Sequence, residues 1–229
     1  MDKIPLTKKK TLSHFFVREF SPFLEKVNHN ARFVNCAKAN IDIPRFRTRD
    51  EVHEFVNRAY FKEGNQPLNY LEFGVFEGAS VKLWSGINHH ADSRFYGFDS
   101  FEGLPEAWRP GFNQGAFDVG GNLPDIKDQR VEFVKGWFQD SLPRFLEGFT
   151  PDLPLVVHND SDLYSSTLYC LTALDCHNVM KPGTIVIFDE FGDPSHEFRA
   201  LWDYASAYRR EWKPIAATYN FWTTAIQLQ

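Results

Sequence analysis

The sequence predicts an α/β fold with a mostly parallel sheet, a C-terminal antiparallel hairpin and an N-terminal helical extension. From Asn69 onward, short apolar runs alternate with segments of helical periodicity, which is typical of a parallel sheet with helices on both faces. Near the C-terminus, residues 214–219 and 221–227 form two β-rich runs separated only by a turn near Asn220. That gap is too short for a crossover helix, so we expect these two runs to pair antiparallel.

The alternating pattern gives the order of the elements. Strands are expected at residues 69–75, 94–99, 130–136, 154–160 and 184–190, and helices at residues 79–90, 140–147, 166–180 and 196–210. Upstream, aromatic and apolar residues at helical spacing predict helices at 11–28 and 49–61, with an irregular segment around Pro44 between them that is suited to covering a pocket. We therefore divide the chain into a helical extension or lid, residues 1–68, and a sheet domain, residues 69–229.

Composition narrows the class of protein. A chain of 229 residues with 43% hydrophobic content can bury one substantial core. The formal charge of -5, without a basic block beyond Lys8–Lys10, argues against a nucleic-acid partner. The three cysteines form no CxxC pair, and no apolar run approaches the length of a membrane span. We expect a cytoplasmic protein with reduced thiols that does not enter a membrane.

A glycine turn follows the first predicted strand, in the run Tyr70–Ser80. The glycines permit close backbone approach, and the helix starting near Ala79 offers free N–H groups to a carboxylate. The spacing from Gly74 to Gly78 is GxxxG rather than the GxGxxG of dinucleotide sites, which favours S-adenosylmethionine as the ligand. A tight turn that binds no ligand fits this motif equally well on its own.

Two further strand ends carry candidate cofactor residues. Asp99 ends the second strand, where a carboxylate can accept hydrogen bonds from both hydroxyls of a ribose. The alternative is that Asp99 caps the turn after Ser100. The third strand leads into Gly136–Phe138, where an aromatic ring can pack on adenine or be buried under the next helix.

Acidic residues end the fourth and fifth strands. Asp160 ends one strand, with Asp162 shortly after it, and Asp189 and Glu190 end the next. If these strands are neighbours, the carboxylates converge and repel unless a cation joins them, and an all-oxygen set favours Mg²⁺ or Ca²⁺ over zinc. The alternatives are that Asp162 caps the following helix and Glu190 is solvated, and we favour the cap only for Asp162. His158 is expected to be a buried, hydrogen-bonded core residue.

These motifs occur together in a known family. In chain order they are Leu71–Val75 with Gly78–Ser80, Gly97–Pro105, Gly115–Phe117, Gly136–Pro143, Asp160–Thr167, Pro182–Gly183 and Asp189–Glu190. The set resembles the macrocin-type O-methyltransferases, which methylate sugar hydroxyls on macrolide and aminocoumarin antibiotics. The resemblance covers about residues 69–190 and implies a seven-stranded, Rossmann-like class I methyltransferase sheet. It also implies S-adenosylmethionine as methyl donor and a bound Mg²⁺.

The resemblance assigns roles to residues of this chain. It makes Asp160, Asp189 and Glu190 the metal ligands and Asp160 also the candidate base. Together with the strand-end analysis, it gives a cofactor site of Glu72, Phe73, Gly74, Gly78, Ser80, Asp99, Ser100, Trp137 and Phe138. Glu190 departs from the family, which usually has a second aspartate there. Residues 1–68 match no family motif, so we expect them to shape the acceptor pocket or a contact between subunits of a homo-oligomer.

The predicted function is Mg²⁺-dependent O-methylation of a hydroxyl on a sugar or another small molecule. A catechol-type O-methyltransferase and a non-catalytic protein that keeps the cofactor fold are the alternatives. A nicotinamide-dependent oxidoreductase is disfavoured, because the chain contains neither GxGxxG nor Tyr-x-x-x-Lys.

Overall fold

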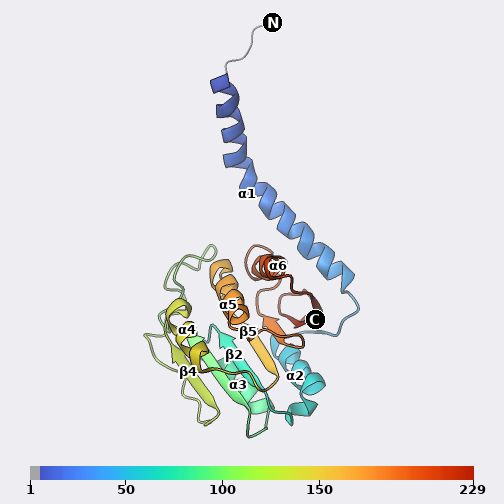
Figure 1. Cartoon of the computed structure of the whole chain (residues 1–229), viewed down its shortest axis with the longest axis vertical. Coiled ribbons are helices and arrows are strands. Elements are labelled where there is room, and N and C mark those ends of the chain that lie inside the picture. The colour runs from blue at the N-terminus through green and yellow to red at the C-terminus, as the bar shows by residue number, and fades with distance from the viewer. Residues whose placement is uncertain (1–5) are drawn as a thin grey trace. The chain divides into compact units, whose positions relative to one another are not determined.

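The computed structural model describes the backbone of residues 6–229 and the side chains of residues 20–229. The chain divides into two compact units, residues 1–41 and residues 42–229. The first unit consists of helix α1 (Leu6–Ala39), which contains the helix predicted at 11–28; the apolar side chains predicted at residues 12–16 lie outside the described side chains. The second unit contains the sheet and the helices after α1 (Figure 1). The residues that line the cavity described under the candidate active site all belong to it.

The division falls earlier than the predicted boundary at residue 68. Helix α2 (Arg49–Tyr60) belongs to the second unit, because Val52 and Val56 are fully buried in its core. The helix begins with a capping box, in which the Thr48 hydroxyl accepts a hydrogen bond from the Glu51 amide and the Glu51 carboxylate accepts one from the Thr48 amide.

The sheet has eight strands in the order β1-β7-β8-β6-β5-β2-β3-β4. The strands are β1 (Arg45–Phe46), β2 (Asn69–Phe73), β3 (Arg94–Asp99), β4 (Val131–Lys135), β5 (Leu155–Asn159), β6 (Ile185–Phe188), β7 (Trp212–Thr218) and β8 (Thr224–Leu228). Strand β8 pairs antiparallel with β6 and with β7, and every other neighbouring pair is parallel. The mostly parallel sheet and its C-terminal hairpin are thus confirmed.

The eighth strand was not predicted. Strand β1 lies in the segment around Pro44 that was expected to be irregular, and it pairs with β7 in the register Arg45↔Ala217. The Pro44 carbonyl accepts a hydrogen bond from the Ala217 amide at 3.0 Å, and the Phe46 carbonyl accepts one from Tyr219 at 2.9 Å. A strand of two residues is too short to show the alternating pattern by which strands are predicted. Pro44 is compatible with this edge position, because its missing N–H is not needed for pairing there.

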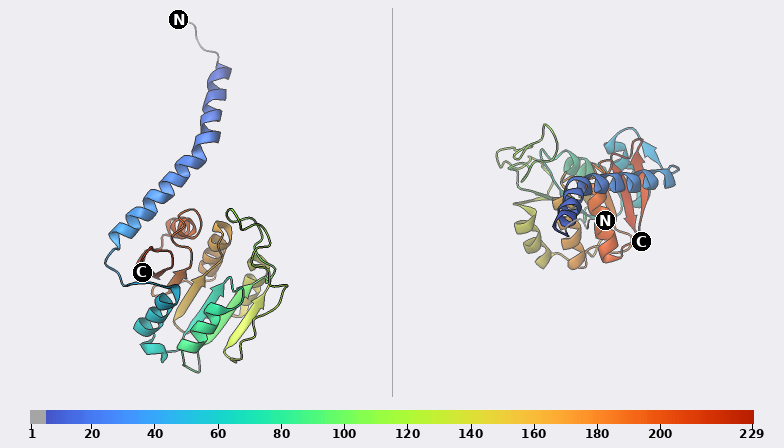
Figure 2. Two further views of the ribbon diagram at one scale, coloured as in Figure 1. Left: turned by 180° about the vertical axis from the view of Figure 1, so that it is seen from behind. Right: turned by 90° about the horizontal axis from the view of Figure 1, so that it is seen from above.

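Helices cover both faces of the sheet, as predicted. Helices α2 and α3 (Ala79–Ile87) pack together on one face, and α4 (Phe138–Gly148), α5 (Tyr164–Cys176) and α6 (Glu197–Tyr208) lie on the other (Figures 1 and 2). A short 3₁₀ helix, Lys62–Gly64, follows α2. Every residue of β2, β5 and β6 is buried, which is why these strands read as continuous apolar runs. Among the described helices, none has the length and apolar character needed to cross a membrane.

The connection from β3 to β4, residues 100–130, contains no helix. Two isolated antiparallel bridges, Glu102↔Asp118 and Arg109↔Phe112, organise it instead. Part of this long segment lines the cavity, so a functional role is expected for it.

Candidate active site

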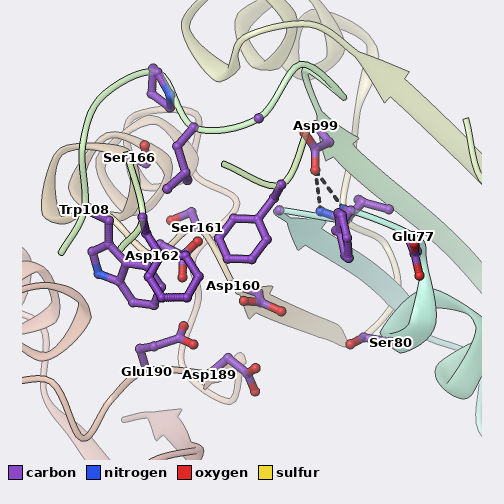
Figure 3. Close-up of a pocket in the computed structure, with 18 of the residues that line it drawn as sticks. Glu77, Ser80, Asp99, Trp108, Asp160, Ser161, Asp162, Ser166, Asp189 and Glu190 are labelled. Atoms are coloured by element: carbon purple, nitrogen blue, oxygen red, sulfur yellow. Dashed lines mark hydrogen bonds between the residues drawn. The ribbon is translucent and has the colours of Figure 1, made fainter. Parts of the chain in front are cut away.

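A cavity of about 520 Å³ lies at the carboxyl ends of β2, β3, β5 and β6 (Figure 3). Its lining comes from the turn after β2, the segment 100–130, the residues after β5 and β6, and the start of α2. Strand β2 has β3 on one side and β5 on the other, so the strand order reverses here. Open α/β sheets bind their ligands at such a point, and the volume suits a small-molecule site.

The glycine turn packs closely against its neighbours, against backbone at Gly74 and against a proline side chain at Gly78. Gly74 has φ +92°, and a Cβ there would lie 1.8 Å from the Asp160 carbonyl oxygen. Gly78 has φ +80°, and a Cβ there would lie 2.8 Å from Pro124 Cβ. Gly74 therefore lets the turn lie close to the residue after β5, and Gly78 lets it lie close to the segment 100–130. Gly74 also lines the cavity.

Asp99 fixes this turn through its carboxylate. Its Oδ2 accepts hydrogen bonds from the amides of Val75 at 2.8 Å and Phe76 at 2.9 Å, and its Oδ1 accepts one from Phe101 at 2.8 Å. The bond from Phe101 is the turn cap weighed as an alternative for this residue. An ionised carboxylate offers about four acceptor positions, so one remains for a ligand hydroxyl on the cavity side.

The predicted cofactor residues divide into two groups. Four of them line the cavity: Gly74, Ser80, Asp99 and Phe138. The others lie outside its lining: Glu72, Phe73, Gly78, Ser100 and Trp137. Phe73 is fully buried against Phe98, and the Ser100 hydroxyl accepts a hydrogen bond from the Glu102 amide at 3.1 Å. Both side chains thus stabilise the scaffold around the site.

Glu72 lies in a buried hydrogen-bond network beneath the cavity. The Tyr70 hydroxyl donates to Glu72 Oε2 and lies 2.9 Å from His158 Nδ1. Because the Tyr70 hydroxyl donates its proton to Glu72, its oxygen is left to accept from His158 in the tautomer that carries a proton on Nδ1. The expectation that His158 is a buried, hydrogen-bonded core residue is confirmed.

A second histidine approaches His158 from α2. His53, His158 and Asp189 have potential ligand atoms within 4.8 Å of one another. The Trp84 indole, however, donates to His53 Nδ1 at 2.7 Å, so a neutral His53 carries its proton on Nε2. Burial, and then the charges of His158 and Arg49, lower the pKa of His53 well below its usual value. His53 is therefore neutral. A protonated Nε2 is a donor, so we do not assign this group to a metal.

The acidic residues after β5 and β6 converge, as predicted. Asp160, Asp189 and Glu190 have carboxylate oxygens within 4.8 Å of one another, and β5 and β6 are parallel neighbours (Figure 3). Glu190 Oε2 is buried without a hydrogen-bond partner among the described residues. Burial, and then the charges of Glu197 and Asp160, raise the pKa of Glu190 to about 11. We call Asp160, Asp189 and Glu190 the acidic cluster.

Arg49 inserts a positive charge into the acidic cluster. Its Nη1 lies 2.6 Å from Asp189 Oδ2 and 3.4 Å from Asp160 Oδ2, and its Nη2 donates to the Ser80 hydroxyl at 3.2 Å. Sequence reasoning missed this residue. The Thr48–Glu51 capping box does mark a helix start at Arg49, but nothing in the sequence places that start beside the strand ends.

Asp162 was expected to cap α5, but the structure assigns it elsewhere. The N-cap of α5 is Leu163, without a side-chain hydrogen bond, and Asp162 lines the cavity. Burial raises the pKa of Asp162 to about 7, against the opposing charge of Arg109. Glu197, on α6, was not predicted either; its carboxylate accepts from the Glu190 amide at 2.8 Å and from Asn159 Nδ2 at 3.0 Å.

The segment 100–130 forms an aromatic wall of the cavity. Trp108, Phe112 and Phe117 line it together with Arg109, whose guanidinium lies 3.7 Å from the Trp108 ring centroid. Phe112 and Phe117 stack with their ring centroids 5.4 Å apart. Figure 3 shows Trp108 and Asp162 on the same side of the cavity as Glu190, with Asp99 and Glu77 on the other. The cavity thus has an acidic and aromatic end and a glycine-turn end.

Comparison with known proteins shows which family this chain is similar to. Residues 116–222 match the model of the family described as Macrocin-O-methyltransferase (TylF). The resemblance inferred from the motifs is confirmed. The match covers the end of the segment 100–130, the acidic cluster and part of the C-terminal hairpin.

Two curated relatives are similar in sequence. A demethyldecarbamoylnovobiocin O-methyltransferase of Streptomyces niveus is 30% identical over 168 residues, covering 62% of each chain. A methyltransferase of Streptomyces olivaceus, named for the 4'-O position of a dimethoxyrhamnosyl tetracenomycin, is 29% identical over 161 residues, covering 58% of each chain. The chain thus spans about three fifths of the length of these relatives.

Solved structures confirm the fold. The calicheamicin methyltransferase CalS11 has a TM-score of 0.58 at 21% identity, over 89% of this chain and 92% of that one. The O-methyltransferase NovP has a TM-score of 0.54 at 22% identity, over 78% of this chain and 76% of that one. The fold is therefore that of the class I methyltransferases, with β1 as an eighth strand.

Proposed function

We propose that this protein is an S-adenosylmethionine-dependent O-methyltransferase that acts on a hydroxyl of a small-molecule sugar or glycoside. The observation that carries the proposal is the cavity at the point of strand reversal, with Asp99 at one end and the acidic cluster at the other. The names of both curated relatives, O-methyltransferases of demethyldecarbamoylnovobiocin and of a dimethoxyrhamnosyl tetracenomycin, support the reaction, and the second name supports a sugar as the acceptor class.

The cofactor is proposed to bind at the glycine-turn end. Gly74, Ser80, Asp99 and Phe138 line that part of the cavity, and Asp99 keeps one acceptor position for a ribose hydroxyl. A Bacillus cereus O-methyltransferase described as being in complex with SAH has a TM-score of 0.50 over 95% of this chain, at 16% identity. The shared fold supports the same class of cofactor here.

Asp160 is proposed as the base. Methyl transfer requires an acceptor oxygen aligned with the methyl group and a group that takes the hydroxyl proton. In the metal-free protein, burial, and then the charges of Asp189 and Asp162, raise the pKa of Asp160 well above its usual value. A cation bound at the acidic cluster would favour the ionised carboxylate, which is the form that accepts the hydroxyl proton. The contact between Gly74 and the Asp160 backbone holds this residue next to the turn proposed for the cofactor.

The acidic cluster fits a hard divalent cation. Asp160, Asp189 and Glu190 offer only oxygen ligands, and the buried, unpartnered Glu190 Oε2 among the described atoms is the kind of group that a cation satisfies. A bound Mg²⁺ would lower the pKa of an acceptor hydroxyl and fix its direction. The carboxylates of this chain orient the acceptor, and Trp108, Phe112 and Phe117 give it an apolar wall to pack on.

The partner is proposed to be a small molecule, and the location the cytoplasm. Cys36, Cys170 and Cys176 are all free thiols, which supports a reducing compartment. Residues 1–41 remain candidates for acceptor recognition or for a subunit contact.

Methyl transfer from radiolabelled S-adenosylmethionine tests the proposal. Rhamnosylated and catechol acceptors are supplied with Mg²⁺, and the Asp160→Asn variant serves as the control. We expect label on the glycosylated acceptor, loss of transfer in the variant and retention of cofactor binding. Label on the catechol alone would instead support the catechol-type alternative. Cofactor binding without transfer to any acceptor would support the non-catalytic one.

A further inference from the structure

Arg49 competes for the oxygens that the acidic cluster offers to a metal. Its Nη1 contacts Asp189 Oδ2 at 2.6 Å and Asp160 Oδ2 at 3.4 Å, so one guanidinium nitrogen bridges two of the three carboxylates. The Asp189 side chain is only 9% exposed, so this charge pair is largely removed from solvent. A charge-assisted bond of this length in such surroundings is among the stronger ones in a protein.

The same oxygens cannot serve Arg49 and a divalent cation together. Hard cations coordinate carboxylate oxygen at about 2.0–2.6 Å, and a guanidinium on the same oxygens would hold two positive charges within a few ångströms. At that distance their repulsion is substantial even with an effective dielectric constant of about 20. A cation that binds these two shared oxygens therefore requires the Arg49 side chain to leave.

The surroundings of Arg49 provide a place for it to go. Its Nε lies 3.6 Å from Asp50 Oδ1, and the Asp50 side chain is 64% exposed. The Arg49 side chain is itself 37% exposed, so it can turn toward Asp50 and solvent without unfolding α2. The capping box of Thr48 and Glu51 anchors the first turn of the helix without using the Arg49 side chain.

We propose that Arg49 is a tethered cation that occupies the acidic cluster in the metal-free protein and is displaced by a divalent cation, so that this residue sets the metal affinity. The proposal rests on the metal site of the proposed function. It gives Arg49 two roles: neutralising the cluster when no metal is bound, and rejecting cations that bind too weakly to displace it. Its bond to Ser80 also links the state of the cluster to the start of α3, where the cofactor is proposed to bind.

Manganese titration of the full chain tests this inference directly. Free Mn²⁺ is measured by electron paramagnetic resonance for the unaltered protein, for Arg49→Gln and for the control Arg58→Gln. Arg58 lies on the same helix, with its guanidinium over the Phe55 ring and outside the cavity lining. We expect Arg49→Gln to bind Mn²⁺ at least about tenfold more tightly than the unaltered protein, and Arg58→Gln to match it.

Arg49→Lys is the second variant, because it keeps the charge and loses the planar fork. Its Mn²⁺ affinity is expected to lie between that of the unaltered protein and that of Arg49→Gln, and thermal melting reports whether each variant is folded. Equal or weaker Mn²⁺ binding by folded Arg49→Gln would overturn the inference while leaving the metal site in place. If neither the unaltered protein nor Arg49→Gln binds Mn²⁺, the inference and the metal site both fail, and the radiolabel assay still decides whether the protein is a methyltransferase.

Discussion

At the scale of single residues, the acids near the cavity differ in whether their side chains can reach a ligand. Glu72 and Asp160 both come from apolar strand ends, but only Asp160 lines the cavity. Glu72 is 1% exposed and shares the Tyr70 hydroxyl with His158. The hydrogen bonds of this network join β2 to β5 in the protein interior. The acids after β5 and β6 line the cavity and are the ones proposed to take part in the reaction.

Removing the shared hydroxyl should destabilise the protein. Tyr70→Phe leaves Glu72 and His158 buried without their common partner, which should cost about 1–3 kcal/mol in the free energy of unfolding, measured by urea denaturation. Tyr219→Phe is the matched control, because Tyr219 is 58% exposed; its effect should stay within about 0.5 kcal/mol. If both variants lost the same free energy of unfolding, the hydrogen bonds of Tyr70 would contribute no more to stability than those of an exposed tyrosine.

At the scale of elements, Asp175 of helix α5 forms an ion pair, away from the cavity, with Arg210, which follows the end of α6. Asp175 on α5 accepts hydrogen bonds from Arg210 Nε at 2.8 Å and Nη2 at 2.6 Å, and from the Tyr204 hydroxyl at 2.5 Å. Burial opposes ionisation of Asp175, but these bonds outweigh it and lower its pKa below 3.8. The ionised carboxylate therefore fixes α6 against α5.

The lowered pKa makes this contribution depend on pH. Stability from Asp175 is present above its unfolded-state pKa, about 3.8, and is lost as the pH falls through the lower folded-state value. Asp175→Asn should therefore cost about 1.5–3 kcal/mol at pH 7 and less near pH 3, measured by urea denaturation. The exposed Asp92→Asn variant is the control. A loss of the same size at both pH values would contradict the ionic account.

The elements themselves were largely readable from the sequence. Strand β3 (Arg94–Asp99) was predicted to the residue, and the other four strands of the predicted parallel sheet to within two residues at each end. Strands β2, β5 and β6 are buried throughout and read as mainly apolar runs, whereas no residue of β4 is fully buried. The convergence of Asp160 with Asp189 followed from the neighbouring strands. The pairing of β1 with β7 and the contact of Arg49 with the acidic cluster could not be predicted from the sequence. Both depend on tertiary contacts between residues 45–49 and parts of the chain more than a hundred residues later. Glu72 does lie on the predicted strand. Because every residue of that strand is buried, its sequence pattern does not show which side chains face the cavity and which face the core.

At the scale of the whole molecule, the cavity is built from one of the two units. Its lining runs from Arg49 to Glu190, entirely within residues 42–229. The core of that unit is also formed by its own residues, from Val52 to Ala225. Cofactor binding should therefore be a property of residues 42–229.

Deleting residues 1–41 separates cofactor binding from acceptor recognition. The shortened chain should melt cooperatively and bind S-adenosylhomocysteine as the full chain does, because it keeps the whole lining. Methyl transfer to the glycosylated acceptor should be lost, in line with the predicted role of the N-terminal segment. Undiminished transfer would remove that role, and loss of cofactor binding in a folded shortened chain would show that the lining is not sufficient.

Calorimetric titration with S-adenosylhomocysteine tests the central claim most directly. We expect one molecule to bind per chain, and Asp99→Ala to weaken binding by about 1.5–3 kcal/mol, because the carboxylate both accepts from the ligand and holds the turn. Asp125→Ala, at an exposed side chain, should bind like the unaltered protein. Absence of binding, or an unchanged affinity in a folded Asp99→Ala variant, would contradict the assignment of this cavity to S-adenosylmethionine.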